Sequence, residues 1–116
     1  MKFSKKGNIY SVRRTTGSQD NILGIVLDSV SDPGWSSNCI EVIEWEFPNI
    51  TERSVKTSKK EVLGQVMLGL QSINSSLSTN YRLTKIYFCP FDSPANEVYS
   101  GLIAKLIRHY HEQGKI

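Results

Sequence analysis

The chain has 116 residues, enough for one domain to bury a hydrophobic core without disulfides or metal ions to support it. Its apolar runs are much shorter than the roughly 20 residues that cross a bilayer, which excludes a membrane-spanning helix. The basic start, Met1 to Lys6, is not followed by an apolar run, so the sequence argues against a secretory signal and we expect a cytoplasmic protein.

Two β-rich runs come first. They extend from Asn8 to Arg14 and from Ile22 to Val30, with turn-forming residues from Thr15 to Asn21 between them, so the pattern predicts a hairpin. The second run is almost continuously apolar, as in a strand at the centre of a sheet. Gly24 within it predicts either a bulge or the close approach of a neighbouring group.

A third strand is predicted from Cys39 to Phe47, where apolar and acidic residues alternate. The adjacent apolar residues Val42 and Ile43 break the alternation, and a bulge at this step would restore it. The residues predicted to face inward are then Ile40, Trp45 and Phe47, and those predicted to share the outer face are Glu41, Glu44 and Glu46. Ile50 to Thr57 is predicted as a short polar edge strand.

The first helix is predicted to begin at Ser58, because Ser58 and Glu61 have the spacing of a capping box. An apolar stripe at helical spacing follows and ends near Ser75 to Asn80. Leu68 points away from that stripe, whereas Gly69 lies at its edge and predicts a close neighbour. The stripe consists of Val62, Leu63, Val66, Met67, Leu70, Ile73 and Leu77.

The last strand and helix follow with little ambiguity. Leu83 to Cys89 is aromatic and β-branched, which favours an interior strand. Ser93 and Pro94 are preferred at the N-cap and first position of a helix, and Gly114 is a plausible residue just after its end. The predicted buried arc consists of Ala95, Val98, Tyr99, Leu102, Ile103, Leu106 and Tyr110.

The order of elements is therefore βββ(β)αβα over residues 1–116. The two helical stripes are most simply buried against one face of a common sheet. The sequence thus predicts a single α+β domain with a largely antiparallel sheet and two helices packed on one face.

A catalytic thiol is the first chemistry to consider, because Cys89 follows a strand and precedes a helix. A Cys-x5-Arg phosphate loop is excluded by Ala95, and a Cys-x-x-Cys redox pair is excluded by Asp92. Cys39 and Cys89 are instead predicted to be buried thiols. A phosphate-binding glycine loop is also missing from the sequence, so we expect neither an enzyme nor a bound cofactor.

The two histidines do not predict a metal site. His109 and His111 are two residues apart on a helix and point in different directions. They also lie about four turns from Ser93, too far along one helix for a catalytic triad. We expect His109 at the edge of the core and His111 in solvent.

The net charge of +3 conceals a strong segregation. From Thr15 to Glu52 there are seven acidic residues and no lysine or arginine, a net charge of −7, while the remainder of the chain carries +10. An acidic surface with an aromatic anchor in a loop is typical of a site for a basic protein partner. The predicted partner-binding residues are Asp32, Trp35, Glu41, Glu44, Glu46 and Glu52.

Three alternatives stay open, and the lowest-ranked is an unrecognised enzyme centred on Cys89. Solvated strand faces are often charged and do no more than interact with water and with the protein's own lysines. The basic residues in turn predict a small RNA- or DNA-binding module, which ranks second because they are scattered over several elements without a recognisable motif. Those basic residues are Lys5, Lys6, Arg13, Arg14, Arg53, Lys56, Lys59 and Lys60, with Tyr10 near them in the sequence.

In size, α+β order and acidic segment the chain resembles the small immunity proteins that bacteria pair with secreted toxins, including those of contact-dependent growth inhibition systems. The resemblance implies a non-enzymatic cytoplasmic inhibitor, or antitoxin, that binds a toxin domain, often a basic nuclease, and blocks its active site or substrate surface. Many such inhibitors are acidic overall, and this chain departs from them in its weakly basic net charge.

Overall fold

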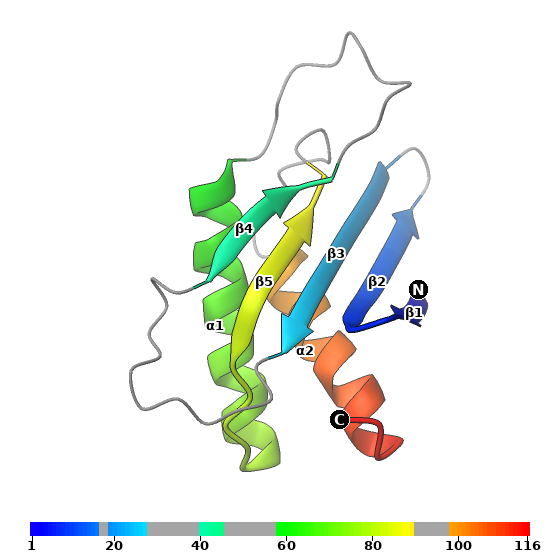
Figure 1. The fold of residues 1–116 in the computed structure, drawn as a ribbon, viewed down its shortest axis with the longest axis vertical. Coiled ribbons are helices and arrows are strands. Elements are labelled where there is room, and N and C mark those ends of the chain that lie inside the picture. The colour runs from blue at the N-terminus through cyan, green and yellow to red at the C-terminus, as the bar shows by residue number, and fades with distance from the viewer. Residues whose placement is uncertain (17–18, 28–39, 46–57, 90–97) are drawn as a thin grey trace, which may run out of the picture.

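A five-stranded sheet with two helices behind it forms the fold in the computed structural model of the chain (Figure 1). The structure describes residues 1–16, 19–27, 40–45, 58–89 and 98–116. The strands are β1 (Lys2–Lys6), β2 (Ile9–Thr16), β3 (Gln19–Leu27), β4 (Glu41–Glu44) and β5 (Leu83–Phe88), and the helices are α1 (Lys59–Leu77) and α2 (Val98–Glu112). The predicted α+β class is confirmed.

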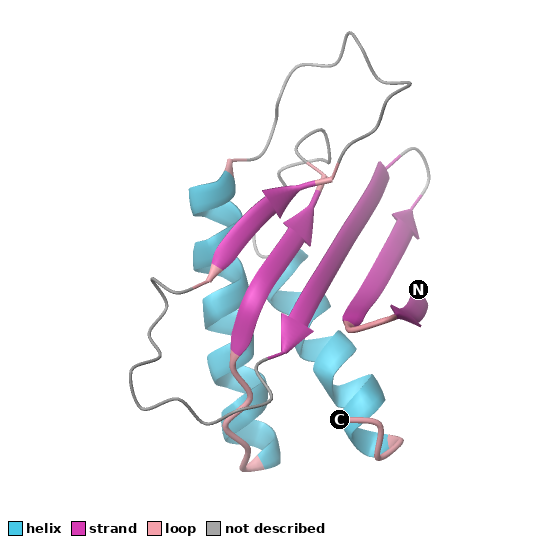
Figure 2. Cartoon of the chain, viewed as in Figure 1, coloured by secondary structure: helices cyan, strands magenta, loops and turns pink. Residues whose placement is uncertain are grey.

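The strand order in the sheet is β1-β2-β3-β5-β4. All neighbouring strands are antiparallel except β4 and β5, which are parallel and are connected through α1. β3 and β5 therefore lie inside the sheet, as their apolar sequences predict. Both helices cover the same face, and Figure 2 shows the strands as a separate layer in front of them.

The first strand, β1, was not predicted. It contains one apolar residue, Phe3, and its other four side chains are exposed, so its sequence lacks the alternation by which a half-buried strand is recognised. Its pairing with β2 runs from Lys2 opposite Arg13 to Lys6 opposite Ile9. Gly7, with a positive φ of 62°, and Asn8 separate the two strands, and this dipeptide is itself a hairpin signal.

The hairpin of β2 and β3 is tighter than predicted. Its pairing extends to Thr16 opposite Gln19, so most of the segment from Thr15 to Asn21 belongs to strands. Cross-strand pairing outweighs the turn preference of these polar residues. The predicted strand from Ile50 to Thr57 lies outside the described residues.

The capping box at the start of α1 is confirmed. The Ser58 Oγ accepts a hydrogen bond from the Glu61 backbone N–H at 3.2 Å and donates one to Glu61 Oε1 at 3.2 Å. The helix ends at Ser78, whose φ of 56° is left-handed, and the Thr79 N–H donates to the Asn74 carbonyl at 2.9 Å. Leu68 is 66% exposed and points away from the apolar stripe, as predicted.

The end of α2 also follows the prediction. Gly114 has a φ of 67°, and its N–H donates to the His111 carbonyl at 3.0 Å. The positive φ closes the helix with an unstrained glycine. The predicted helix-start residues Ser93 and Pro94 lie outside the described residues, and Ile107 joins the predicted arc as a further buried side chain.

The core lies between the sheet and the helices. α1 and α2 are in close contact at Gly69, where a Cβ atom would collide with the Ser100 backbone oxygen and the Ile103 side chain. The predicted close neighbour of Gly69 is thus α2. The largest fully buried side chains include Tyr99, Phe88, Leu23, Ile25, Ile73 and Leu83.

Replacing Gly69 by alanine should destabilise the protein by about 1 to 3 kcal/mol, because the added methyl group overpacks the helix contact. Alanine is the better helix former by about 1 kcal/mol, so a gain is expected where space is open. Gly64, in the same helix with no atom near its missing Cβ, provides this control. Urea denaturation should show loss for Gly69→Ala and a gain for Gly64→Ala; equal effects would contradict the packing argument.

Candidate binding surface

The face of the sheet turned away from α1 and α2 is covered by no other described helix or strand (Figure 1). Side chains alternate between the two faces along each strand. On β5, Ile86 and Phe88 are buried towards the helices, whereas Lys85 and Tyr87 point to the opposite, open face. The open face is therefore the broadest uncovered surface of the described sheet.

The register of β4 corrects the prediction for its side chains. β4 pairs with β5 without interruption, from Glu41 opposite Lys85 to Glu44 opposite Phe88, so the predicted bulge at Val42 and Ile43 is absent. The Trp45 N–H donates to the Phe88 carbonyl at 2.8 Å and continues the ladder. A regular strand has no need of the bulge, because Val42 packs on the core and Ile43 faces outward.

This register places Trp45 on the open face, where its ring stacks with Tyr87, whereas the sequence predicted it to face inward. The ring centroids are 5.7 Å apart and the ring planes are inclined by 26°. The Trp45 ring also lies over Gly24, whose missing Cβ would be 2.9 Å from Trp45 Cη2. The close approach predicted at Gly24 is thus confirmed, and the neighbour is a tryptophan.

Charged and apolar residues surround this aromatic pair. Ile43 is half-buried and lies opposite Tyr87, while Glu41 and Lys85 are exposed and directly opposite each other. An apolar, aromatic centre with a charged margin is the arrangement of protein–protein interfaces. We refer to Trp45, Tyr87, Ile43, Glu41 and Lys85 as the aromatic face.

Of the predicted partner-binding residues, the structure describes Glu41 and Glu44. Both are exposed, but strand alternation puts them on opposite faces of the sheet, so the prediction that they share one face is wrong. Asp32, Trp35, Glu46 and Glu52 lie outside the described residues, as does Phe47.

The basic residues are less scattered than the sequence suggested. Lys5, Lys6, Arg13 and Arg14 come together on β1 and β2, whereas Lys59 and Lys60 begin α1. Arg53 and Lys56 lie outside the described residues.

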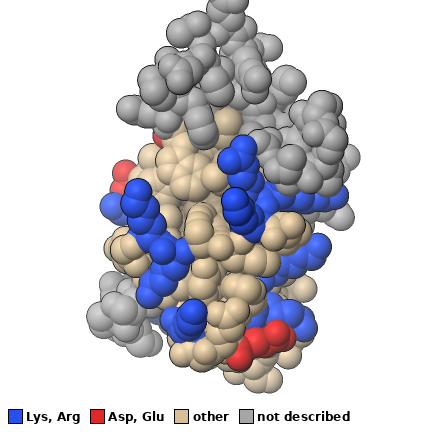
Figure 3. All heavy atoms as spheres, turned by 90° about the vertical axis from the view of Figure 1, so that its right-hand side faces the viewer, with Lys and Arg blue, Asp and Glu red and all other residues tan. Residues whose placement is uncertain are grey.

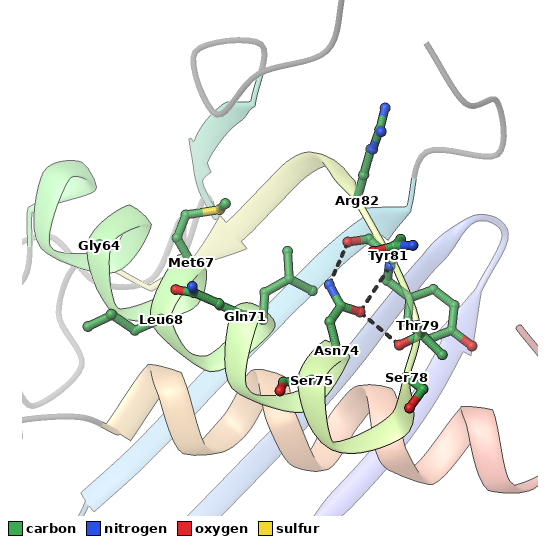
Figure 4. Close-up of a pocket in the computed structure, with 12 residues that line it drawn as sticks. Gly64, Met67, Leu68, Gln71, Asn74, Ser75, Ser78, Thr79, Tyr81 and Arg82 are labelled. Atoms are coloured by element: carbon green, nitrogen blue, oxygen red, sulfur yellow. Dashed lines mark hydrogen bonds between the residues drawn. The ribbon is translucent and has the colours of Figure 1, made fainter. Parts of the chain in front are cut away.

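A cavity of about 760 Å³ lies beside the end of α1 (Figure 4). Its polar residue Asn74 is engaged in local structure: its amide donates to the Tyr81 carbonyl at 3.0 Å, and its Oδ1 accepts from the Tyr81 N–H and the Thr79 hydroxyl. The described lining contains no carboxylate, imidazole or thiol; besides Arg82, it offers hydrogen bonds and apolar contact with Met67 and Leu68.

The histidines pack against aromatic rings. His109 stacks on Phe3 with centroids 4.0 Å apart, as expected of a core-edge residue. His111 is half-buried, and its Nδ1 lies 2.6 Å from the Tyr81 hydroxyl, so the prediction that it is solvated is wrong. Cys89 is a buried thiol, 5% exposed, as predicted, and Cys39 lies outside the described residues. Within the described ranges no cluster of His, Cys, Asp or Glu could hold a metal ion.

Comparison with protein-family models, curated proteins and solved structures gave no match. Among the described helices, none is long and apolar enough to span a membrane.

Replacing Gly24 by alanine should displace the Trp45 ring, because the new Cβ would lie 2.9 Å from it. We expect a loss of about 1 to 3 kcal/mol in stability, as for other overpacked sites, and a red-shifted tryptophan emission. The measurement is best made in a Trp35→Phe background, so that Trp45 alone reports. Unchanged emission and stability would show that the ring does not lie over Gly24.

Tyr81 and Tyr110 predict a loss of stability at high pH. Burial, and secondly the nearby Tyr10, raises the pKa of both phenols above the usual 10.0. The folded state holds these protons more tightly, so the stabilisation is complete below about pH 10 and is lost as pH rises through the raised pKa values. The double variant Tyr81→Phe/Tyr110→Phe should show a shallower alkaline decline in urea denaturation; an unchanged slope would contradict this assignment.

Proposed function

We propose that the chain is a non-enzymatic binding protein that docks a protein partner on the aromatic face. The observation that carries the proposal is the Trp45 and Tyr87 stack on a sheet face that no described helix or strand covers. Tryptophan and tyrosine are the residues most enriched among those that dominate binding energy.

The stack is suited to this role because it is held in place before a partner arrives. The Trp45 ring stacks with the Tyr87 ring, and it also packs over Gly24, where the lack of a side chain leaves room for it. A rigid aromatic side chain loses little conformational entropy on binding, so more of its contact energy appears as affinity. Glu41 and Lys85 at the margin supply charges that steer encounter rather than large affinity.

The partner we propose is a toxin domain, with the chain acting as its immunity protein in the cytoplasm. Support comes from the resemblance of build to toxin-immunity proteins and from the segregated charge, −7 between Thr15 and Glu52. In this proposal Glu41 belongs to the contact, and the acidic and aromatic residues predicted from the sequence, Asp32, Trp35, Glu46 and Glu52, extend it.

The test is to identify the genes beside that of this chain, co-express the chain with any toxin domain they encode, and measure growth rescue and affinity. Trp45→Ala should weaken the complex by about 30-fold, because truncating a central aromatic anchor costs about 2 kcal/mol or more. Leu68→Ala, at an exposed apolar residue on α1, is the matched control and should bind normally. Full rescue and affinity with Trp45→Ala would overturn the site, and no complex with wild type would overturn the function.

Charge reversal at the margin has a different expected effect. Glu41→Lys should lower the association rate and its dependence on salt, while the dissociation rate changes little. Glu112→Lys, at the exposed end of α2, makes the same charge change elsewhere and serves as the control. Equal association rates for the two variants would remove Glu41 from the contact.

A further inference from the structure

Five exposed basic side chains gather on the first two strands: Lys2, Lys5, Lys6, Arg13 and Arg14. We refer to them as the basic edge. It lies towards the opposite edge of the sheet from the aromatic face, with β3 between β2 and β5. Figure 3, in which this side faces the reader, shows lysine and arginine side chains spread over it and described acidic ones only towards its margins.

α2 brings a further cation to the basic edge. Phe3 of β1 stacks on His109 of α2, which fixes that face of the helix beside the strand. Lys105 is exposed and precedes His109 by four residues, so it lies on the same face of α2. Positive charge therefore continues from the strands onto the helix.

Protection of the sheet edge accounts for only part of this charge. Lysines on an edge strand prevent pairing with other chains, and β1 is such a strand. Arg13 and Arg14, however, lie on β2, which is paired on both sides. Lys2 lies directly opposite Arg13, so two cations on adjacent strands share one face of the sheet.

The spacing and the neighbouring hydroxyl groups favour a phosphate chain. Lys2, Ser4 and Lys6 share one face of β1, and Lys2 and Lys6 are about 13 Å apart at ~3.3 Å per residue. That distance corresponds to about four base-pair steps along the axis of a duplex, at ~3.4 Å per step. Between the two lysines, the Ser4 and Ser11 hydroxyls are hydrogen-bonded to each other at 2.6 Å, which leaves one O–H of the pair to donate to a phosphate or sugar oxygen.

We propose that the basic edge binds the phosphate backbone of nucleic acid without reading its sequence. Lys2, Lys6 and Arg13 contact phosphates on the open side of the sheet, and Lys5, Arg14 and Lys105 extend the field around its edge. The hydroxyl pair of Ser4 and Ser11 supplies one hydrogen bond between the cations. This surface functions independently of the aromatic face.

The test is fluorescence anisotropy with a labelled 20-nucleotide single strand and a duplex of the same length, from 50 to 200 mM salt. The logarithm of affinity should fall linearly with that of salt concentration, by about 0.9 per phosphate contact for duplex and 0.7 for single strand. The double variant Lys2→Ala/Arg13→Ala, which removes two phosphate contacts, should lower the affinity and reduce that slope by about 1.8 for the duplex and about 1.4 for the single strand. A second pair, Lys2→Gln/Lys6→Gln, should do the same without altering β2.

Lys59→Ala/Lys60→Ala is the matched control, because it removes the same charge from the start of α1. It should keep the wild-type slope. An equal loss of affinity in the test and control variants would mean that only net charge matters, and it would overturn the proposal. The absence of binding at 50 mM salt would also overturn it. Binding to phosphatidylserine vesicles in preference to either nucleic acid would also overturn it. Trp45→Ala should leave nucleic-acid affinity unchanged, so this proposal and the protein-binding one can fail separately.

Discussion

The close approach of α1 and α2 at Gly69 is the contact on which the rest of the structure depends. Five strands about 4.8 Å apart span roughly 19 Å, a width that two helices of about 10 Å diameter cover when they lie side by side on one face. Without a side chain at Gly69 both helices fit on one face, and their apolar stripes form one core. No described helix covers the opposite face, so the apolar positions there are covered only by side chains of the sheet itself.

The side chains of that open face differ between its two sides. On the β4 and β5 side, Trp45 extends over Gly24 and stacks on Tyr87, so one strand fills the space left by another. On the β1 and β2 side the surface is polar and cationic. The two proposed functions follow this division: a protein partner at the aromatic face and a phosphate backbone at the basic edge.

The sequence predicted what local chemistry determines. The capping box at Ser58, the helix end at Gly114 and the close contacts at Gly24 and Gly69 each depend on a residue type with a narrow set of uses. The sequence-based prediction failed where the structure of a strand depends on its pairing with a neighbouring strand. β1 was missed because its sequence has no apolar alternation. The face on which Trp45 lies was predicted wrongly because it is set by the register of β4 with β5. The candidate surface was therefore only partly predictable, since Glu41 was identified but its neighbours Tyr87 and Lys85 come from a strand more than forty residues away.

The pairing of β3 with β5 also has a kinetic consequence. β1, β2 and β3 form contacts between residues close in sequence, whereas Leu23 pairs with Phe88 across most of the chain. Local hairpins form within about 1 to 10 μs, but closing a long loop must precede any gain from its contacts. We therefore expect the three-stranded amino-terminal unit to form early and the joining of β5 to β3 to set the folding rate.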